Sequence, residues 1–292
     1  MAELPEEKNV EETQSLIPAD VDEVIAAPEE AVAPAVIAKV EKEVSLAAQR
    51  GLENWKPKTE LGRRVMNGEI KSIDYVFQQG WKILEAEIVD MLLPGIENDI
   101  ILVGGATGKG GGIRRIPGRR TARMHKSGRR FKTSCLVVVG NKDGYVGVGM
   151  GKALDFRQAA VKAIKIAKLS LIPVQRGCGS WECGCRTQHT LPATIEGKRG
   201  SVRVMLKPAP RGVGLVVSDE IKKMLSLAGF KDVWIKSQGQ TQARVNHINA
   251  VFDALKKLNA YKFSAVARER CAIKAGSIFG TLGSEVTPKT VG

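Results

Sequence analysis

The sequence has no apolar run close to the roughly 18 residues that a membrane-spanning helix needs, and its acidic start shows no apolar segment of the secretory type. Its five cysteines lack the spacing of a disulfide scaffold, so they are expected to stay reduced. These absences argue against a membrane protein and against a secreted, disulfide-stabilised fold. The expected location is the cytoplasm, with no membrane partner.

Groups of residues with catalytic chemistry are also lacking. The three histidines, His125, His189 and His247, do not stand with a Ser or Cys nucleophile and a third orienting residue. The carboxylates are scattered singly along the chain. The protein is therefore predicted not to be an enzyme.

Two glycine-rich segments resemble nucleotide-binding loops but depart from the motifs. A phosphate-binding loop needs Gly where position 103 is Val, and it needs Ser or Thr where Gly110 follows Lys109. In Gly147–Gly151 the last glycine comes one residue too early for a dinucleotide-binding turn, and no acid follows at the required distance. An NTP-using enzyme is the alternative class, and micromolar nucleotide affinity would favour it.

Charge is distributed unevenly along the 292 residues. Residues 1–50 hold 12 acids and 4 bases and are rich in Ala and Pro, which predicts an acidic, disordered tail. The remaining residues hold 19 acids and 41 bases, a net charge of +22. A body this basic repels itself unless a polyanion neutralises it, so nucleic acid is the predicted partner.

The clearest local pattern is a β-hairpin followed by a helix. Cys135–Val139 is an apolar, Val-rich strand, Asn141–Gly144 supplies turn residues, and Tyr145–Gly149 returns as a second strand. A helix is predicted from Asp155, with Lys162, Lys165 and Lys168 in water. The glycines of the second strand leave one face bare, for close packing on a helix or on RNA backbone.

The strongest functional signal precedes this hairpin. Eight of the 29 residues in Gly104–Lys132 are Gly, and Lys109–Lys132 has ten Lys or Arg and no acid. The segment shows no periodicity and is predicted to be a long loop. A solvated charge run is the structural alternative, but the missing acids favour binding to a phosphate backbone.

The second half of the sequence predicts a smaller α/β unit. Strands are expected near 201–206, 214–217 and 232–236, with helices near 219–228 and 245–258. Short helices are also expected at 73–79 and 85–93, a strand at 99–103, and a short helix within 264–271. Cys135 and Cys271 are expected to be buried small apolar residues.

Cys178, Cys183, Cys185 and His189 lie within 12 residues of an irregular, glycine-rich segment. Their side chains are those of a structural zinc site, although the spacing is not one of the common pairs. The alternatives are packed, reduced thiols and a segment ordered by docking on RNA. No cofactor is the expectation, with zinc as the alternative.

Three stretches, Trp55–Asp90, Ser127–Val174 and Gly200–Leu258, resemble the universal family of small-subunit ribosomal protein five. The Trp55 block and the RGCGSWECGC segment give the resemblance an archaeal character. It implies an α+β fold, in which a double-stranded-RNA-binding-like α-β-β-β-α domain precedes a β-α-β-α domain. Eukaryotic members of the family lack these cysteines, so docking on ribosomal RNA is the favoured account of the Cys-rich segment.

The resemblance also implies a role in the small ribosomal subunit. Expected partners are ribosomal RNA near the decoding region and mRNA entry, small-subunit proteins four and eight, and mRNA, and the expected effect is support of translational accuracy. A free regulatory RNA-binding protein is the other alternative. The predicted organisation is an acidic tail (1–50), an RNA-binding-like domain (51–172) with its basic loop (104–132), a Cys-rich connector (173–194), a second α/β domain (195–262) and a C-terminal tail (263–292).

Residues 126–131 match the RNA-contacting segment of the family, and Lys152 matches the basic residue after its glycine-rich strand. The arginines between 114 and 123 have no counterpart there and rest on charge alone. The predicted RNA-binding residues are Arg114, Arg115, Arg119, Arg120, Arg123, Lys126, Ser127, Gly128, Arg129, Arg130, Phe131, Lys132 and Lys152.

Overall fold

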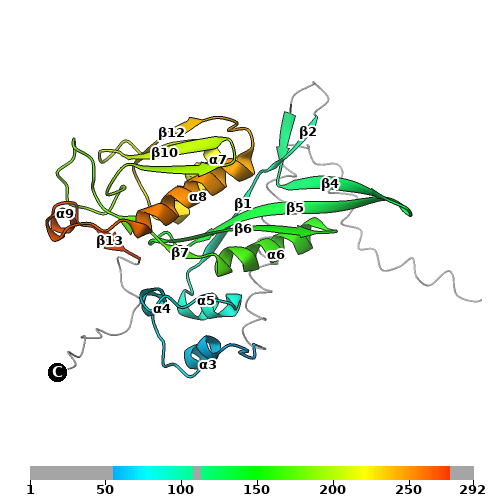
Figure 1. Ribbon diagram of the computed structural model, residues 1–292, viewed down its shortest axis with the longest axis horizontal. Helices are drawn as coiled ribbons and strands as arrows, with labels where there is room; N and C mark the ends of the chain where they lie inside the picture. Colours follow the sequence, from blue (N-terminus) through cyan, green and yellow to red (C-terminus); the bar gives the residue numbers. More distant parts are fainter. Residues whose placement is uncertain (1–54, 108–112, 277–292) are drawn as a thin grey trace, which may run out of the picture. The chain divides into compact units, whose positions relative to one another are not determined.

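The computed structural model describes residues 55–107 and 113–276 (Figure 1). The predicted acidic tail, part of the predicted C-terminal tail, and residues 108–112 of the predicted loop lie outside the described residues. Within the described ranges, no helix combines the length and the apolar character needed to cross a bilayer.

The first sheet is antiparallel and has the order β1-β5-β6-β7, with β4 paired to the outer half of β5. Its core is the predicted hairpin, in which Val137 pairs with Gly149 and Val139 with Gly147. The strands are β1 (Glu97–Ile101), β4 (Gly118–His125), β5 (Gly128–Gly140), β6 (Tyr145–Ala153) and β7 (Ile172–Pro173).

The turn between β5 and β6 forms where its residues predict it. The Asn141 side-chain oxygen accepts hydrogen bonds from the backbone N–H groups of Asp143 (2.9 Å) and Tyr145 (3.1 Å). Lys142 and Gly144 both have positive φ, and a glycine makes the second of these inexpensive.

Helix α6 (Phe156–Leu169) covers one face of this sheet (Figure 1). Asp155 caps it by accepting from the Phe156 N–H at 2.7 Å. A Cβ on Gly147, Gly149 or Gly151 would overlap a carbonyl oxygen of α6, so these glycines allow the helix to approach the strand closely. The bare glycine face is therefore a helix-packing surface rather than an RNA contact.

The prediction that Lys168 lies in water is wrong. Its side chain is 7% exposed, and its Nζ lies 2.6 Å from a carboxylate oxygen of Asp90 on α5 (Ala86–Leu92). The helices α5 and α6 pack together, which the periodicity of α6 alone cannot reveal. Burial raises the pKa of the Asp90 carboxyl, although Lys168 opposes that shift.

The N-terminal block adds α3 (Glu60–Met66), which the sequence reading missed, and α4 (Ile73–Gln78). Glu85 holds the start of this block in place, because its carboxylate accepts hydrogen bonds from Trp55 Nε1 (2.8 Å) and from the backbone N–H of Thr59 (2.7 Å). The block has its own apolar cluster, in which Ile73, Val76 and Ile88 are fully buried.

The second sheet has the order β11-β12-β10-β9, and helices α7 and α8 cover one of its faces. Apolar residues of both sheets and of α8, among them Val138, Val204 and Val251, belong to a single buried cluster. The elements are β9 (Ile195–Arg199), β10 (Val202–Pro208), β11 (Leu215–Val216), α7 (Asp219–Leu227), β12 (Val233–Gln238) and α8 (Arg244–Ala260).

The segment after α8 returns to the connector. Helix α9 (Ala265–Arg270) confirms the predicted short helix, and β13 (Lys274–Ala275) pairs with β8 (Gln175–Arg176). Arg176 is buried and donates to Asp143 at 2.8 Å, which ties the connector to the hairpin turn. Cys271 is only partly buried, whereas Cys135 is 1% exposed, so the prediction of burial holds for Cys135 alone.

Candidate nucleic-acid interface

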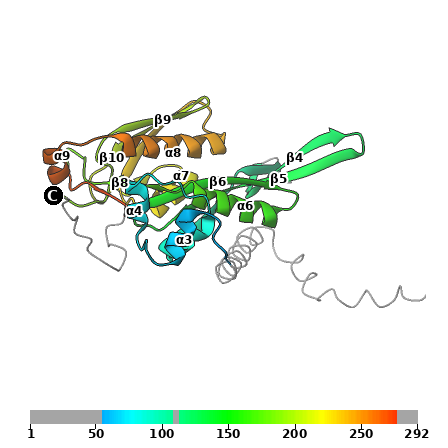
Figure 2. The same cartoon turned by 60° about the horizontal axis from the view of Figure 1, so that its bottom comes forward.

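The basic segment is not a loop, and that prediction is wrong. β2 (Gly104–Thr107) pairs with β3 (Ile113–Ile116), and β4 pairs with the outer half of β5 from Gly118↔Cys135 to His125↔Gly128. The outer part of β4–β5 has both faces in solvent, so it lacks the alternation of apolar and polar residues by which a half-buried strand is recognised. Figure 2 shows this hairpin running out beyond α6.

One face of the β4–β5 hairpin carries cations with no apolar partner. Directly opposed residues of an antiparallel pair share a face, and so do residues two apart along a strand. The register therefore places Arg119, Arg123, Arg130 and Lys132 on one face, and Lys152 of β6 follows on the same face through its pairing with Ser134. We call these five residues the cationic face; all five are exposed.

The opposite face combines arginine with an aromatic ring. The Arg120 guanidinium carbon lies 3.9 Å from the centroid of the Phe131 ring, and that of Arg129 lies 5.3 Å from it. Phe131 is itself 36% exposed, and Met124 beside it is 79% exposed. This arrangement offers guanidinium planes for stacking and for phosphates next to a ring that can receive a base.

The tip of the hairpin is a tight turn through Lys126 and Ser127. Gly128 has φ of 105°, a value that other residues reach only with strain. The Ser127 hydroxyl accepts a hydrogen bond from Arg130 Nη2 at 3.0 Å. Ser127 and Gly128 thus shape the tip and orient one arginine, and Lys126 adds a further exposed cation.

The remaining predicted residues lie on β3. Arg115 is half-buried and pairs with Gly105 of β2. Arg114 belongs to the same strand by its backbone, while its side chain lies outside what the structure describes. The predicted residues are therefore gathered on the β2–β3 hairpin, which forms a two-stranded sheet of its own beside β4, and on β4, β5 and β6 of the first sheet.

In the part of the chain that the structure describes, no carboxylate forms an ion pair with any Lys or Arg from Arg119 to Lys132. Elsewhere, cations such as Lys168 and Arg176 do have carboxylate partners. Unpaired cations at this density repel one another, and an added polyanion relieves that repulsion. The hairpin therefore suits phosphate contacts, and it carries no group arranged for chemistry.

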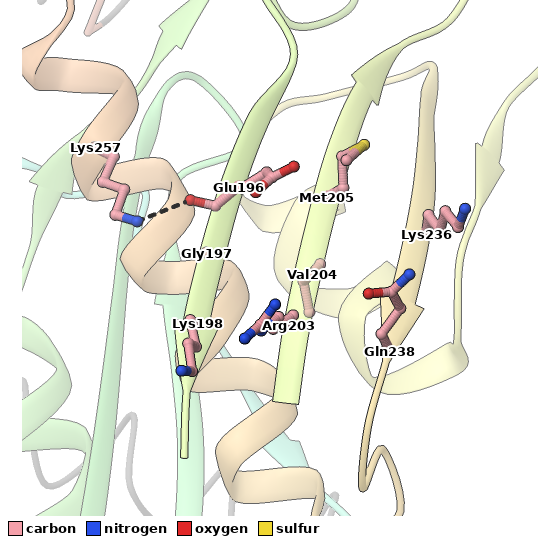
Figure 3. A pocket seen from close by; sticks show the side chains of 9 residues that line it. All are labelled: Glu196, Gly197, Lys198, Arg203, Val204, Met205, Lys236, Gln238 and Lys257. Carbon is pink, nitrogen blue, oxygen red and sulfur yellow. Dashed lines mark hydrogen bonds between the residues drawn. The ribbon is translucent and has the colours of Figure 1, made fainter. Parts of the chain in front are cut away.

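A second basic surface lies on the open face of the second sheet, and the sequence reading missed it. Lys198 pairs with Arg203, Lys236 lies across from Met205, and all three cations are exposed (Figure 3). Lys257 of α8 lies at the edge of this face and donates to the Glu196 carbonyl at 3.1 Å. The signal in the sequence was at least one Lys or Arg in each strand of this face: Lys198 in β9, Arg203 and Lys207 in β10, and Lys236 in β12.

The structure also brings together the four residues of the Cys/His cluster. One ligand atom from each of Cys178, Cys183, Cys185 and His189 lies within 4.8 Å of the others. Burial raises the pKa of the Cys178 thiol to about 12. Burial also acts to raise the pKa of the Cys185 thiol, but hydrogen bonds from Thr187 and the neighbouring cysteines outweigh it and leave the pKa at about 6.

Comparison with known proteins agrees with this architecture. Two family models match, "Ribosomal protein S5, N-terminal domain" over residues 114–175 and "Ribosomal protein S5, C-terminal domain" over residues 197–270. The first covers the basic hairpin, the central hairpin and α6. It includes the arginines between 114 and 123, so the expectation that these have no counterpart in the family is wrong. The second covers most of the second sheet with both its helices and α9.

Several similar proteins come from archaea, and each is named small ribosomal subunit protein uS5. The protein of Nanoarchaeum equitans is 49% identical over 208 residues, which is 71% of this chain and 89% of that protein. That of Methanococcus maripaludis (strain C6) is 47% identical over 226 residues, with 77% and 92% covered. That of Aeropyrum pernix is 48% identical over 217 residues, with 74% and 92% covered.

The unpaired cationic hairpin suits an RNA-binding protein, and the matching family models and relatives identify the class as structural, non-enzymatic proteins of the ribosome. The chain belongs to the ribosomal protein S5 family, in its archaeal form. The resemblance seen in the sequence and the α+β fold are both confirmed.

Proposed function

We propose that the protein binds small-subunit ribosomal RNA near the decoding region and the mRNA entry through the β4–β5 hairpin, and that this contact supports translational accuracy. The observation that carries the proposal is the pair of unlike hairpin faces. The cationic face offers five exposed charges to phosphates, and the other face offers Phe131 between two arginines.

Each face has a separate task in this proposal. Phosphate contacts position the protein and supply most of the salt-dependent affinity. The exposed Phe131 ring stacks on an unpaired base, which is the usual way in which proteins read loops and bulges of RNA. A strand of eight residues spans about 26 Å, so β4 can reach several successive phosphates along one groove.

The body behind the hairpin is suited to hold it in place. The outer half of β5 continues directly into the buried inner half, in which Leu136–Val139 are at most 1% exposed. A site on a strand that is anchored in the core keeps its geometry better than one on a free loop. Proteins four and eight of the small subunit and mRNA are the further proposed partners, and the cytoplasmic ribosome is the proposed location.

The test is to follow tagged variants through sucrose gradients and to measure misreading with a reporter gene. Changing Arg119, Arg123 and Arg130 to Gln should reduce co-sedimentation with small subunits and increase misreading. The matched control changes Lys71, Lys82 and Lys162, which are exposed cations outside the hairpin, to Gln. Unchanged sedimentation and misreading in the hairpin variant, or equal losses in the control, would contradict the proposal.

A further inference from the structure

The Cys-rich segment between β8 and β9 is folded back on itself. Gly177 and Thr190 exchange two backbone hydrogen bonds, of 2.9 and 3.0 Å, and the Gly179 N–H donates to the Leu191 carbonyl at 3.0 Å. This pairing lies on both sides of Cys178 and brings it beside His189, eleven positions further along the chain. Cys178 and His189 are 6% and 4% exposed.

The distances among the four ligand atoms match those around a tetrahedral metal ion. With zinc–sulfur bonds of about 2.3 Å and zinc–nitrogen bonds of about 2.0 Å, the ligand atoms lie roughly 3.5–3.8 Å apart. Cys178 Sγ lies 3.5 Å from Cys185 Sγ, and Cys183 Sγ lies 3.8 Å from His189 Nε2. These two pairs share no atom, so they form opposite edges of the tetrahedron, and no edge exceeds 4.8 Å.

A buried carboxylate orients the histidine. His189 Nδ1 lies 2.7 Å from one oxygen of Asp232, which turns Nε2 toward the cysteines. The other Asp232 oxygen accepts from the backbone N–H groups of Gly212 (3.1 Å) and Gly214 (2.8 Å). Metal-binding histidines almost always have such a carboxylate or carbonyl partner on the second ring nitrogen.

We propose that Cys178, Cys183, Cys185 and His189 bind one Zn²⁺ ion, with Asp232 as the residue that positions His189. The three cysteines bind as thiolates, so zinc binding releases to solvent the protons of those thiols that still carry one, while the imidazole binds in its neutral form through Nε2. Three thiolates and one imidazole suit zinc in a closed, four-coordinate structural site, and they leave no position open for catalysis.

A zinc ion bound to these four residues would hold the Cys-rich connector (residues 173–194) against the second sheet. His189 accepts from the Lys231 N–H (2.9 Å) through its carbonyl, and Asp232 directly precedes β12. Burial of large side chains does not supply this order, because Trp181 is 90% exposed. Ordering each backbone residue costs about 1–2 kcal/mol, which the binding of a metal offsets.

The test is metal analysis of the full-length protein, purified under reducing conditions without chelator. We expect about one zinc per chain, and replacement by Co²⁺ should give the visible absorption of a tetrahedral thiolate site. Cys183→Ser and His189→Gln should each abolish tight binding. Asp232→Asn should retain the ion but lower zinc affinity about 10–100-fold in competition with a chelator.

Cys271→Ser is the matched control. The Cys271 backbone carbonyl accepts a hydrogen bond from the Cys178 N–H at 2.8 Å, and this bond does not need the Cys271 thiol, so the variant should keep its zinc. Wild-type protein that binds neither zinc nor Co²⁺, a disulfide between Cys178 and Cys185, or thiols that become protected only when small-subunit RNA is added would each overturn the proposal. The Co²⁺ spectrum of the wild type decides the matter even if a ligand variant fails to fold.

Discussion

The salt dependence of RNA binding should reveal how many cations of the β4–β5 hairpin lie on phosphates. The perturbation is the triple variant in which Arg119, Arg123 and Arg130 of the cationic face become Gln. These side chains are exposed, so the variant should keep the melting temperature of the wild type, as surface substitutions usually change stability by less than about 0.5 kcal/mol. A loss of binding can then be assigned to the interface.

The magnitude follows from the charge count. Each cation on a duplex phosphate contributes about −0.9 to the slope of log affinity against log salt concentration. The five residues of the cationic face together contribute about −4.5, and the three arginines about −2.7 of that. Between roughly 50 and 200 mM salt, wild-type affinity should therefore fall about 40-fold more than that of the variant.

The assay is a filter-binding or fluorescence titration of a small-subunit RNA fragment at four or more salt concentrations. The control variant with Lys71, Lys82 and Lys162 changed to Gln removes the same charge from other surfaces. A slope that is unchanged in the hairpin variant would refute the phosphate contacts. Equal flattening in both variants would show that net charge, and not the hairpin, determines binding.

Three further outcomes are expected. Phe131→Ala should weaken binding to single-stranded RNA loops by about 1–3 kcal/mol in titrations, whereas Phe131→Tyr keeps the ring and should bind normally; equal losses would exclude stacking. Gly149→Ala should lower the free energy of unfolding by about 1–3 kcal/mol because its Cβ overlaps α6, while Gly184→Ala, which meets no atom within 4 Å, should not; denaturant melts of both decide this. Lys168→Met should destabilise the fold because it leaves the Asp90 carboxylate buried and unpaired. Since burial raises the pKa of Asp90, the loss of unfolding free energy should be small at acidic pH, where Asp90 is protonated, and should grow as the pH rises past the pKa of Asp90 in the folded state. Urea melts that show the same loss at every pH would contradict this.

Much of the fold could be predicted because its signals are local. The β5–β6 turn is encoded in Asn141–Gly144, and α6 is encoded in its cap at Asp155 and in a regular apolar spacing. The sequence reading missed strand β9 because Gly197 interrupts its pattern of apolar residues. In the structure this glycine allows α8 to pack closely on the strand.

The sequence reading gave the outer hairpin the wrong structure, while its assignment to phosphate binding stays a prediction. Charge is visible residue by residue, so Arg119 to Lys132 could be assigned to phosphate binding from composition alone. The pairing of β4 with β5 is not visible in the same way, because neither face of the outer hairpin is buried and no periodicity results. The cation–π contacts of Phe131 depend on that pairing and therefore needed the structure.

The sequence reading also missed pairs of interacting residues that lie far apart along the chain. Asp232 lies 43 positions from His189, and Asp90 lies 78 positions from Lys168. No spacing rule connects such pairs. The four proposed metal ligands could be named from the sequence because they are close together in it, but the carboxylate that orients His189 could not.

The central claim is that the β4–β5 hairpin lies on small-subunit RNA near the decoding region. The most direct measurement places a photo-crosslinking amino acid at position 124, where the exposed Met124 stands beside Phe131 on the hairpin. Crosslinked nucleotides are then mapped on small subunits that have incorporated the protein. We predict crosslinks confined to small-subunit RNA around the decoding region and the mRNA entry. Crosslinks only to other RNA regions, or only to protein, would contradict the claim.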